Sequence, residues 1–441
     1  MLSSRTNSSV SSNGSRHHSS EDDSPLLPTF IEEPKPALRS SSRPWSSRRR
    51  RRYIYLIGTL LFVVFIFHAQ IVVAWRDFGY IIRPLWDTPR EGLEPWAVIT
   101  HHSKPHPGGA DNTSWCALHG WEVRDSPAVL VDALPFSFEL DLLEIRMREY
   151  AGLVSSIVVI ESIMTYAGTP KPLYLAPQME RFEELSRQTG IRLVYKQVGD
   201  DFVPNIPKGS FENEVKQRSA IRDIIEGERD NGHIPDGAII LIADTDELIS
   251  RETLELMSAC KVPDSMHFNL KNYRFSFNLP LPDAGNWVAK TETVKKGEEF
   301  GYSRYRAADA PLLENAGWHC TFCFPTLEDM RHKMGTYSHN DRLTNPRLLE
   351  EKQLRHRVCT GQDPFGMWPE VFSFSDLVTQ SIDVTPLLSF QHLPLALKQD
   401  PKRFPYLVDK GRHSMGVYQS EKVPQLHVGH PFGSVRHPGE A

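Results

Sequence analysis

The stretch AIILIADTDE, residues 238–247, joins a short apolar run to a cluster of carboxylates. An uninterrupted run of this length is typical of a central parallel strand that is covered on both faces. In open α/β sheets ligands bind beyond the carboxyl ends of the strands, which is where Asp244 and Asp246 stand. Two hard oxygen donors one residue apart can share a divalent cation that bridges to phosphate oxygens. The stretch therefore predicts an α/β fold with a diphosphate site, while an ordinary acidic loop start or helix cap is the alternative.

The segments around this stretch alternate between strand-like and helix-like patterns. The strand-like runs are short and apolar, and the helix-like runs repeat apolar residues every three or four positions. Strands are expected at residues 129–134, 156–160 and 191–195, helices at 136–150, 211–226 and 253–259, and an extended Phe- and Tyr-rich segment at 266–278. This order predicts a twisted, mostly parallel sheet with helices on both faces.

The N-terminal part of the chain predicts a membrane anchor. Residues 1–52 form a Ser- and Pro-rich tail that ends in five consecutive arginines, a composition that buries too little apolar surface to fold. The apolar run over residues 53–75 is long enough to span a hydrocarbon core about 30 Å thick. Arginines before the run favour a cytoplasmic N-terminus. We therefore expect a disordered tail and a single transmembrane signal anchor of type II topology, because the run is too long and too internal for a cleaved signal peptide.

Beyond the anchor we expect a stem over residues 76–127 and one lumenal domain over residues 128–441. The stem contains the glycosylation acceptor Asn112-Thr113-Ser114. Five cysteines in an oxidising compartment permit up to two disulfides and leave one thiol over. Cys320 and Cys323 have the spacing of a zinc half-site or a redox pair, but a structural role is favoured outside the cytosol. The net charge of −5 gives no indication of a nucleic-acid partner.

Several short motifs give the chain a resemblance to a known family. They occur in order at residues 141–146 (DLLEIR), 160–162 (IES), 217–218 (QR), 244–247 (DTDE), 317–319 (GWH) and 338–341 (SHND). Together, over residues 134–407, they resemble glycosyltransferase family 17, the family of the enzyme that adds bisecting N-acetylglucosamine to N-glycans. The resemblance implies a GT-A-like, Rossmann-type fold, UDP-N-acetylglucosamine as donor, and Mn²⁺ or Mg²⁺ as cofactor. It also implies inversion at the anomeric carbon and a β-1,4 linkage to a mannose-containing glycan or glycoprotein at the Golgi membrane.

The same motifs supply candidates for binding the donor and the metal. The donor is expected at Glu161, Arg218, Asp244 and Glu247, and the metal at Asp244, Asp246 and His339. An imidazole can ligate a borderline metal or, when protonated, pair with phosphate. The alternatives are a hydrogen-bonded core histidine, a structural carboxylate at the end of a strand, and a helix arginine that is solvated or paired.

Transfer to a hydroxyl also requires a base and an acceptor pocket. A carboxylate must take the acceptor proton during attack, and Glu328, Asp341 and Glu314 are the candidates. Each of the three is otherwise an ordinary surface or structural carboxylate. Trp318 and His319 are expected to shape the acceptor pocket by stacking on sugar, with core packing as the alternative.

Two other classes of protein compete with this interpretation. A dehalogenase-type phosphatase also has Asp-x-Asp after a strand, but it normally has Thr or Val where this chain has Leu248, and that strand normally opens its domain. A catalytically inactive, membrane-anchored glycan-binding protein is the second alternative. The intact carboxylates of residues 244–247 count against it.

Overall fold

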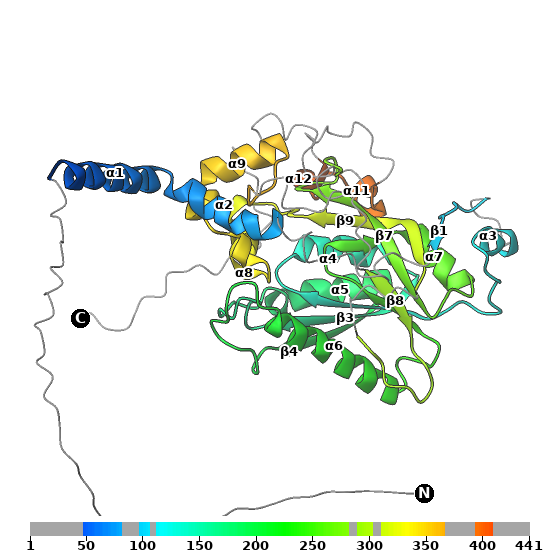
Figure 1. The fold of residues 1–441 in the computed structure, drawn as a ribbon. Coiled ribbons are helices and arrows are strands. Elements are labelled where there is room, and N and C mark those ends of the chain that lie inside the picture. The colour runs from blue at the N-terminus through cyan, green and yellow to red at the C-terminus, as the bar shows by residue number, and fades with distance from the viewer. Residues whose placement is uncertain are drawn as a thin grey trace, which may run out of the picture. The chain divides into compact units, whose positions relative to one another are not determined.

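The computed structural model describes residues 47–81, 97–105, 112–281, 289–302, 310–366 and 393–408. The part of the chain from residue 97 onward that these ranges cover is built around a nine-stranded sheet (Figure 1). The strands are β1 (Val98–Ile99), β2 (Leu130–Phe136), β3 (Val154–Ser162), β4 (Arg192–Val198), β5 (Ile239–Ile242), β6 (Glu247–Ile249), β7 (Ser265–Arg274), β8 (Lys290–Thr293) and β9 (Leu312–Thr321).

The sheet is mixed, with a parallel half that carries the site. The strand order is β1-β9-β7-β8-β5-β2-β3-β4, and β6 pairs with β9 outside this path. The pairs β2–β3, β2–β5 and β3–β4 are parallel, whereas β8 runs antiparallel to β5 and β7. The prediction that β5 lies between parallel strands is therefore correct for its neighbour β2 and wrong for its neighbour β8. On the other side the returning strand β8 replaces the expected parallel neighbour.

Helices cover the sheet on both faces (Figure 1). The α-helices of the described residues are α1 (Ser47–Ile66), α2 (His68–Ile81), α3 (Thr113–Leu118), α4 (Leu140–Glu149), α5 (Met179–Thr189), α6 (Glu212–Asp230), α7 (Arg251–Ala259), α8 (Leu327–Thr336), α9 (Glu351–Thr360), α11 (Leu395–Gln399) and α12 (Pro405–Val408), of which α4, α5 and α6 pack against the sheet. Capping side chains fix where two of them begin. The Ser250 side chain accepts from the Thr253 amide at the start of α7, and the Thr326 side chain accepts from the Asp329 amide at the start of α8.

The alternation of side chains along the parallel strands divides the core into two layers. Leu130 and Ile157 point to the layer that holds α4 and α5, whereas Val131 and Val158 point to the layer that holds α6. Each fully buried Leu, Ile or Val contributes roughly 1.5–3 kcal/mol relative to an exposed one. The mostly apolar composition of these strands is therefore what the two covered faces require.

The predicted elements are found close to their expected positions. Strands β2, β3, β4, β5 and β7 and helices α4, α6 and α7 correspond to the segments predicted from hydrophobic pattern. Among the elements that were not predicted are α5, β9 and α8. Their sequences are polar or irregular, and the register of the β7–β9 pairing shifts between Phe268 and Leu270 of β7.

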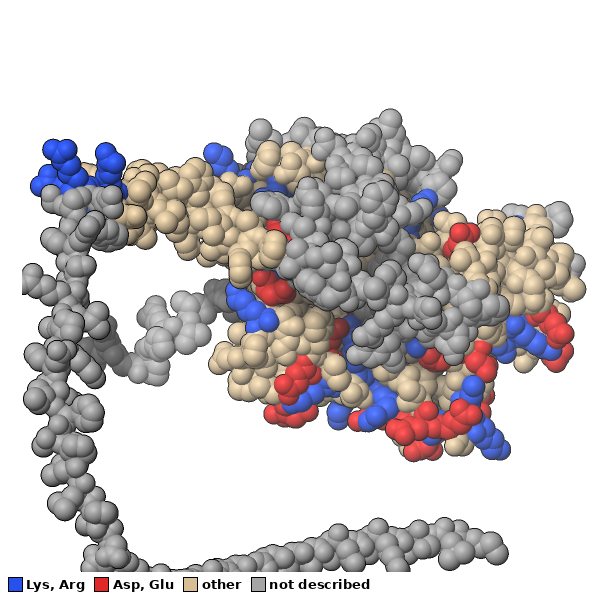
Figure 2. Space-filling view, in the orientation of Figure 1, with Lys and Arg blue, Asp and Glu red and all other residues tan. Residues whose placement is uncertain are grey.

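The apolar run over residues 53–75 lies in two helices rather than one. Helix α1 ends at Ile66 and α2 begins at His68, so the expected single helix is interrupted. No helix in the described ranges is long and apolar enough to cross a membrane. Large apolar side chains of α1 are nevertheless exposed, among them Leu60 at 62% and Phe65 at 80%. In Figure 2 basic side chains gather at the start of this helix and uncharged ones follow.

Two disulfides are present, as the cysteine count allows. Cys116 in α3 is joined to Cys260 at the end of α7, and Cys320 in β9 is joined to Cys323. A disulfide does not fit a zinc half-site, but it is compatible with a structural bond and with a redox pair, so the structural role stays a prediction. Cys359 is the cysteine outside both bonds. The predicted tail, except its last residues, and residues 82–96 and 106–111 of the predicted stem lie outside the described residues.

Candidate functional site

The carboxylate cluster forms a tight turn between β5 and β6, which we call the Asp-x-Asp turn (residues 244–247). The Glu247 amide donates to the Asp244 carbonyl at 3.0 Å, and the Asp244 amide donates to Glu247 Oε2 at 2.8 Å. The Thr245 hydroxyl donates to the Pro135 carbonyl at 3.0 Å. These bonds leave Asp244 and Asp246 at the carboxyl end of β5, where ligands bind in such sheets.

A buried arginine holds the backbone of this turn from below. Arg146 in α4 is fully buried and forms a bidentate pair with Asp132 in β2, with both N–O distances 2.6 Å. Its Nη1 also donates to the carbonyls of Asp244 at 2.7 Å and Glu247 at 2.6 Å. Burial lowers the pKa of Arg146, but Asp132 beside it outweighs this effect and raises the pKa. The guanidinium therefore stays charged and fixes both ends of the turn.

The first aspartate of the turn faces an arginine from α6. Arg218 Nη2 lies 3.0 Å from Asp244 Oδ1 and 2.9 Å from Glu214 Oε1. Glu214 also accepts from the Ser338 hydroxyl, which ties the segment around residue 338 to the turn. Arg218 Nη1 is buried and has no hydrogen-bond partner among the described residues. A buried guanidinium with a spare donor beside a ligand-facing carboxylate can bind phosphate oxygens.

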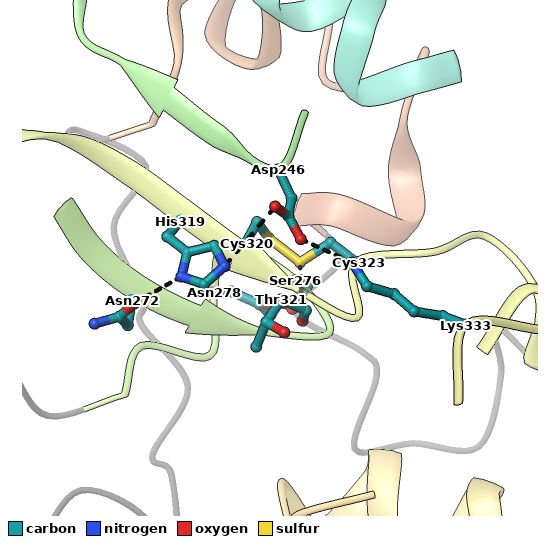
Figure 3. The surroundings of a disulfide bond; sticks show 9 residues. All are labelled: Asp246, Asn272, Ser276, Asn278, His319, Cys320, Thr321, Cys323 and Lys333. Atoms are coloured by element: carbon teal, nitrogen blue, oxygen red, sulfur yellow. Dashed lines mark hydrogen bonds and ion pairs between the residues drawn. A yellow bond between two sulfur atoms is a disulfide. The ribbon is translucent and has the colours of Figure 1, made fainter. Parts of the chain in front are cut away.

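The second aspartate faces a lysine and a histidine (Figure 3). Lys333 Nζ lies 2.8 Å from Asp246 Oδ2 and 3.6 Å from Glu139 Oε1. His319 Nε2 lies 3.9 Å from Asp246 Oδ1, while its Nδ1 is 3.0 Å from Asn272 Oδ1. Burial raises the pKa of Asp246, but Lys333 and His319 outweigh this effect and lower the pKa below its usual value. Asp246 is therefore ionised at neutral pH.

One known protein family matches this chain over most of its length. The family model for glycosyltransferase family 17 matches residues 48–413, well over half of the chain. This chain belongs to glycosyltransferase family 17. Membership favours the interpretation of the Asp-x-Asp turn as a nucleotide-sugar site over a phosphatase nucleophile.

Individual relatives of this family-17 chain are distant. The human and rat enzymes named β-1,4-mannosyl-glycoprotein 4-β-N-acetylglucosaminyltransferase are each 22% identical to it over 246 residues, or 49% of this chain. The chain spans less than half of those relatives' own length, 45% of the human and 44% of the rat protein. The solved structure of PaToxG glycosyltransferase is 10% identical in sequence to this chain, and the match covers 40% of this chain and 57% of PaToxG. The TM-score of this match is 0.17, which is too low for a comparison of the two folds.

The structure does not assemble the metal set that was predicted for the family-17 chain. No group of three or more His, Cys, Asp or Glu side chains that could hold a metal occurs among the described residues. His339 packs edge-on against the rings of Phe211 and Tyr337, and burial and then Arg342 lower its pKa. The imidazole beside Asp246 is instead His319, because β9 pairs with β6 directly after the turn.

The predicted donor residues divide into two kinds. Arg218 and Asp244 lie together at the turn, as expected for neighbours of one ligand. Glu161 is completely buried; its carboxylate accepts from the Tyr174, Leu175 and Ala176 amides and from the Tyr195 hydroxyl at 2.8 Å. Glu247 is buried too and turns back onto the Asp244 amide. Both of these carboxylates make bonds that shape the loops around the site.

The three candidate bases lie in different places. Glu328 is on α8 with a side chain that is 77% exposed and pairs with Arg331 at 2.8 Å. Glu314 is in the part of β9 where pairing with β7 is irregular. Asp341 lies in the short helix η3 (Asn340–Arg342), three residues after the Ser338 that bonds Glu214. The elements of all three candidates contact the surroundings of the Asp-x-Asp turn, and Glu328 differs from the others in that its own side chain is largely exposed.

The two predicted acceptor residues lie on opposite faces of β9. His319 faces Asp246, whereas Trp318 packs beside Leu248 and lines a cavity of about 1190 Å³. Neighbouring residues of a strand point to opposite faces, so the two side chains cannot stack on one sugar ring together. His319 is therefore the member of the pair that lies beside Asp246, and acceptor binding by either residue stays a prediction.

Sequence reasoning did not assign several charged residues of the site. Lys333 and Glu139 belong to no motif that was recognised, and only the fold brings α8 and the start of α4 to the turn. Arg146 lies within the DLLEIR motif, which marked the segment without indicating what the arginine does. An arginine among the apolar positions of an amphipathic helix pattern is the sequence signal that could have identified the role of Arg146.

Proposed function

We propose that this chain transfers N-acetylglucosamine from UDP-N-acetylglucosamine to a mannose-containing glycan, with inversion and a β-1,4 linkage. The observation that carries the proposal is the Asp-x-Asp turn at the end of β5, flanked by the cations Arg218 and Lys333. Family membership and the names of the human and rat relatives support the sugar and the linkage. The parallel half of the sheet supports a GT-A-like arrangement in which the donor lies across the strand ends.

The residues of the turn fit a divalent cation of the Mn²⁺ or Mg²⁺ type. Asp244 and Asp246 offer two hard carboxylate oxygens, and their side chains are 33% and 12% exposed. Such cations commonly take one or two carboxylates from the protein and complete their coordination with phosphate oxygens and water. When bound, the cation would neutralise negative charge on the departing UDP.

The chain's own residues would supply the remaining chemistry. Arg146 fixes the turn so that both carboxylates are pre-organised. The spare donor of Arg218 would bind a phosphate oxygen, and a carboxylate, for which Asp341 is our candidate, would accept the proton of the attacking hydroxyl. Attack from the face opposite the leaving UDP then gives the inverted product.

We further propose that residues 53–75 anchor the enzyme in the Golgi membrane with the catalytic domain lumenal. The exposed apolar side chains of α1 and the arginines at its start support membrane attachment. The Cys116–Cys260 and Cys320–Cys323 disulfides support an oxidising compartment. Proteolysis of sealed microsomes should remove the N-terminal tail and spare the catalytic domain; complete degradation would contradict this topology.

A transfer assay tests the proposed reaction. Purified full-length chain in detergent should move N-acetylglucosamine from its UDP derivative to mannose-containing N-glycans in the presence of Mn²⁺. Asp246→Asn should remove measurable transfer while the protein remains folded, because it takes away charge needed at the diphosphate rather than core packing. The matched control is Asp236→Asn, an exposed loop aspartate, which should keep the wild-type rate. Full activity of Asp246→Asn would refute the assignment of the turn.

A further inference from the structure

Lys333 forms an ion pair with Asp246, the carboxylate that would bind the proposed cation. Its Nζ lies 2.8 Å from Asp246 Oδ2, and the two side chains are 17% and 12% exposed. A divalent ion bound at Asp246 would place two further positive charges beside this ammonium. The ion and the ammonium therefore compete for one carboxylate, unless the ammonium gains another anionic partner.

The surroundings of Lys333 restrict which partner that can be. The Nζ lies 5.9 Å from the ring centroid of Phe322 and 5.3 Å from that of Phe324. These aromatic side chains offer only weak cation–π stabilisation, so a largely buried ammonium still requires a nearby anion. Among the described residues, Glu139 is the other carboxylate in an ion pair with Lys333, its Oε1 3.6 Å from Nζ. One oxygen of Glu139 is already used, since Oε2 accepts from the Phe138 amide at 2.9 Å.

A donor diphosphate would bring anionic oxygens to this position. In the proposed function Asp246 would hold the cation that neutralises the diphosphate, and the anionic phosphate oxygens would then be available as partners for the ammonium of Lys333, 2.8 Å from Asp246. The ammonium would need only a small rotation of its flexible stem to change from a carboxylate to a phosphate partner. The position is therefore suited to exchange of one partner for the other.

We propose that Lys333 changes its ion pair from Asp246 to the donor diphosphate when donor and cation bind. This inference rests on the proposed function. In the absence of nucleotide the lysine holds Asp246 and opposes cation binding. With the nucleotide in place it becomes a phosphate contact that stabilises the leaving UDP. Binding of nucleotide and of cation is consequently coupled, and each raises the affinity for the other.

Calorimetric titration of the full-length chain separates this role from a structural one. In Lys333→Met the carboxylate loses its competitor, so Mn²⁺ alone should bind about tenfold more tightly than to wild type. UDP without metal should bind about tenfold more weakly, because a charge-assisted contact to phosphate is lost. Uridine, which has no phosphate, should bind equally to both. Lys352→Met, on the exposed side of α9, is the matched control and should change none of these affinities.

Opposite changes in the two affinities are the decisive result. Unchanged UDP affinity in Lys333→Met overturns the phosphate contact, and unchanged or weaker Mn²⁺ binding overturns the competition. If Lys333→Met does not fold, wild-type protein still provides a test: Mn²⁺ affinity that is the same with and without UDP overturns the inference. Wild type that binds no UDP at all instead refutes the proposed function on which the inference rests.

Discussion

The two sides of the Asp-x-Asp turn are built differently. Below it, the support pair Asp132–Arg146 is completely buried, bidentate, and bonded to two carbonyls of the turn. Above it, the ligand-facing pairs Arg218–Asp244 and Lys333–Asp246 are partly exposed. A completely buried, bidentate pair such as Asp132–Arg146 fixes the backbone, whereas a partly exposed pair such as Lys333–Asp246 can exchange partners with a ligand. The comparison separates residues that hold the site from residues that would act in it.

The largest further effect on turnover is expected at the base. Asp341→Asn should lower turnover by roughly 10² to 10⁴ and leave the KM for the donor nearly unchanged, because it removes proton transfer and not donor binding. Glu328→Gln, on an exposed surface, is the comparison and should be near wild type. Steady-state kinetics on both variants decide between them. Normal turnover of Asp341→Asn would show that Asp341 is not the base and would leave Glu328 and Glu314 as the candidates.

The support pair should instead control stability. Arg146→Met leaves Asp132 buried without its counter-ion, which typically costs about 3–5 kcal/mol. Arg187→Met, whose side chain is 66% exposed and pairs with Glu184, should cost less than about 1 kcal/mol. Denaturant unfolding of the two variants measures the difference. Equal stabilities would show that the turn does not depend on the buried pair.

A buried carboxylate on α4, Glu144, contributes to the acid sensitivity of the domain. Burial raises the pKa of Glu144, but Arg403, Arg181 and Arg148 outweigh it and lower the pKa from 4.5 to about 2. A depressed pKa stabilises the fold above pH 4.5, and this contribution is lost as the pH falls toward 2.

Unfolding measured between pH 6 and pH 2.5 tests this contribution. The free energy of unfolding of wild type should fall more steeply with acid than that of Glu144→Gln, which lacks the titrating group. Glu184→Gln, which alters a half-exposed ion pair on α5, should retain most of the wild-type slope. Identical slopes for wild type and Glu144→Gln would contradict the assigned pKa.

The sequence predicted the ligand-facing side of the turn better than its support. Asp244, Asp246 and Arg218 were recognised because they stand in a motif or directly after an apolar strand. Lys333 was not, since nothing in a polar helix far along the chain indicates that it packs against the end of β5. Such contacts depend on tertiary arrangement, which periodicity does not encode.

The same limit applies to the predictions for His339, Trp318 and His319. His339 was placed near the metal because its motif was recognised, but burial against Phe211 and Tyr337 determines its position. Trp318 and His319 were treated as one pocket because they adjoin in sequence, while strand geometry separates them. The α/β order and the apolar strands were predictable because burial on both faces leaves a local pattern.

Mass spectrometry of released N-glycans tests the central claim most directly. Cells carrying the wild-type chain should contain N-glycans with one additional N-acetylglucosamine on a mannose. Cells carrying equal amounts of the Asp246→Asn chain should lack them. Identical glycan profiles from the two kinds of cell would contradict the account that the Asp-x-Asp turn transfers this sugar.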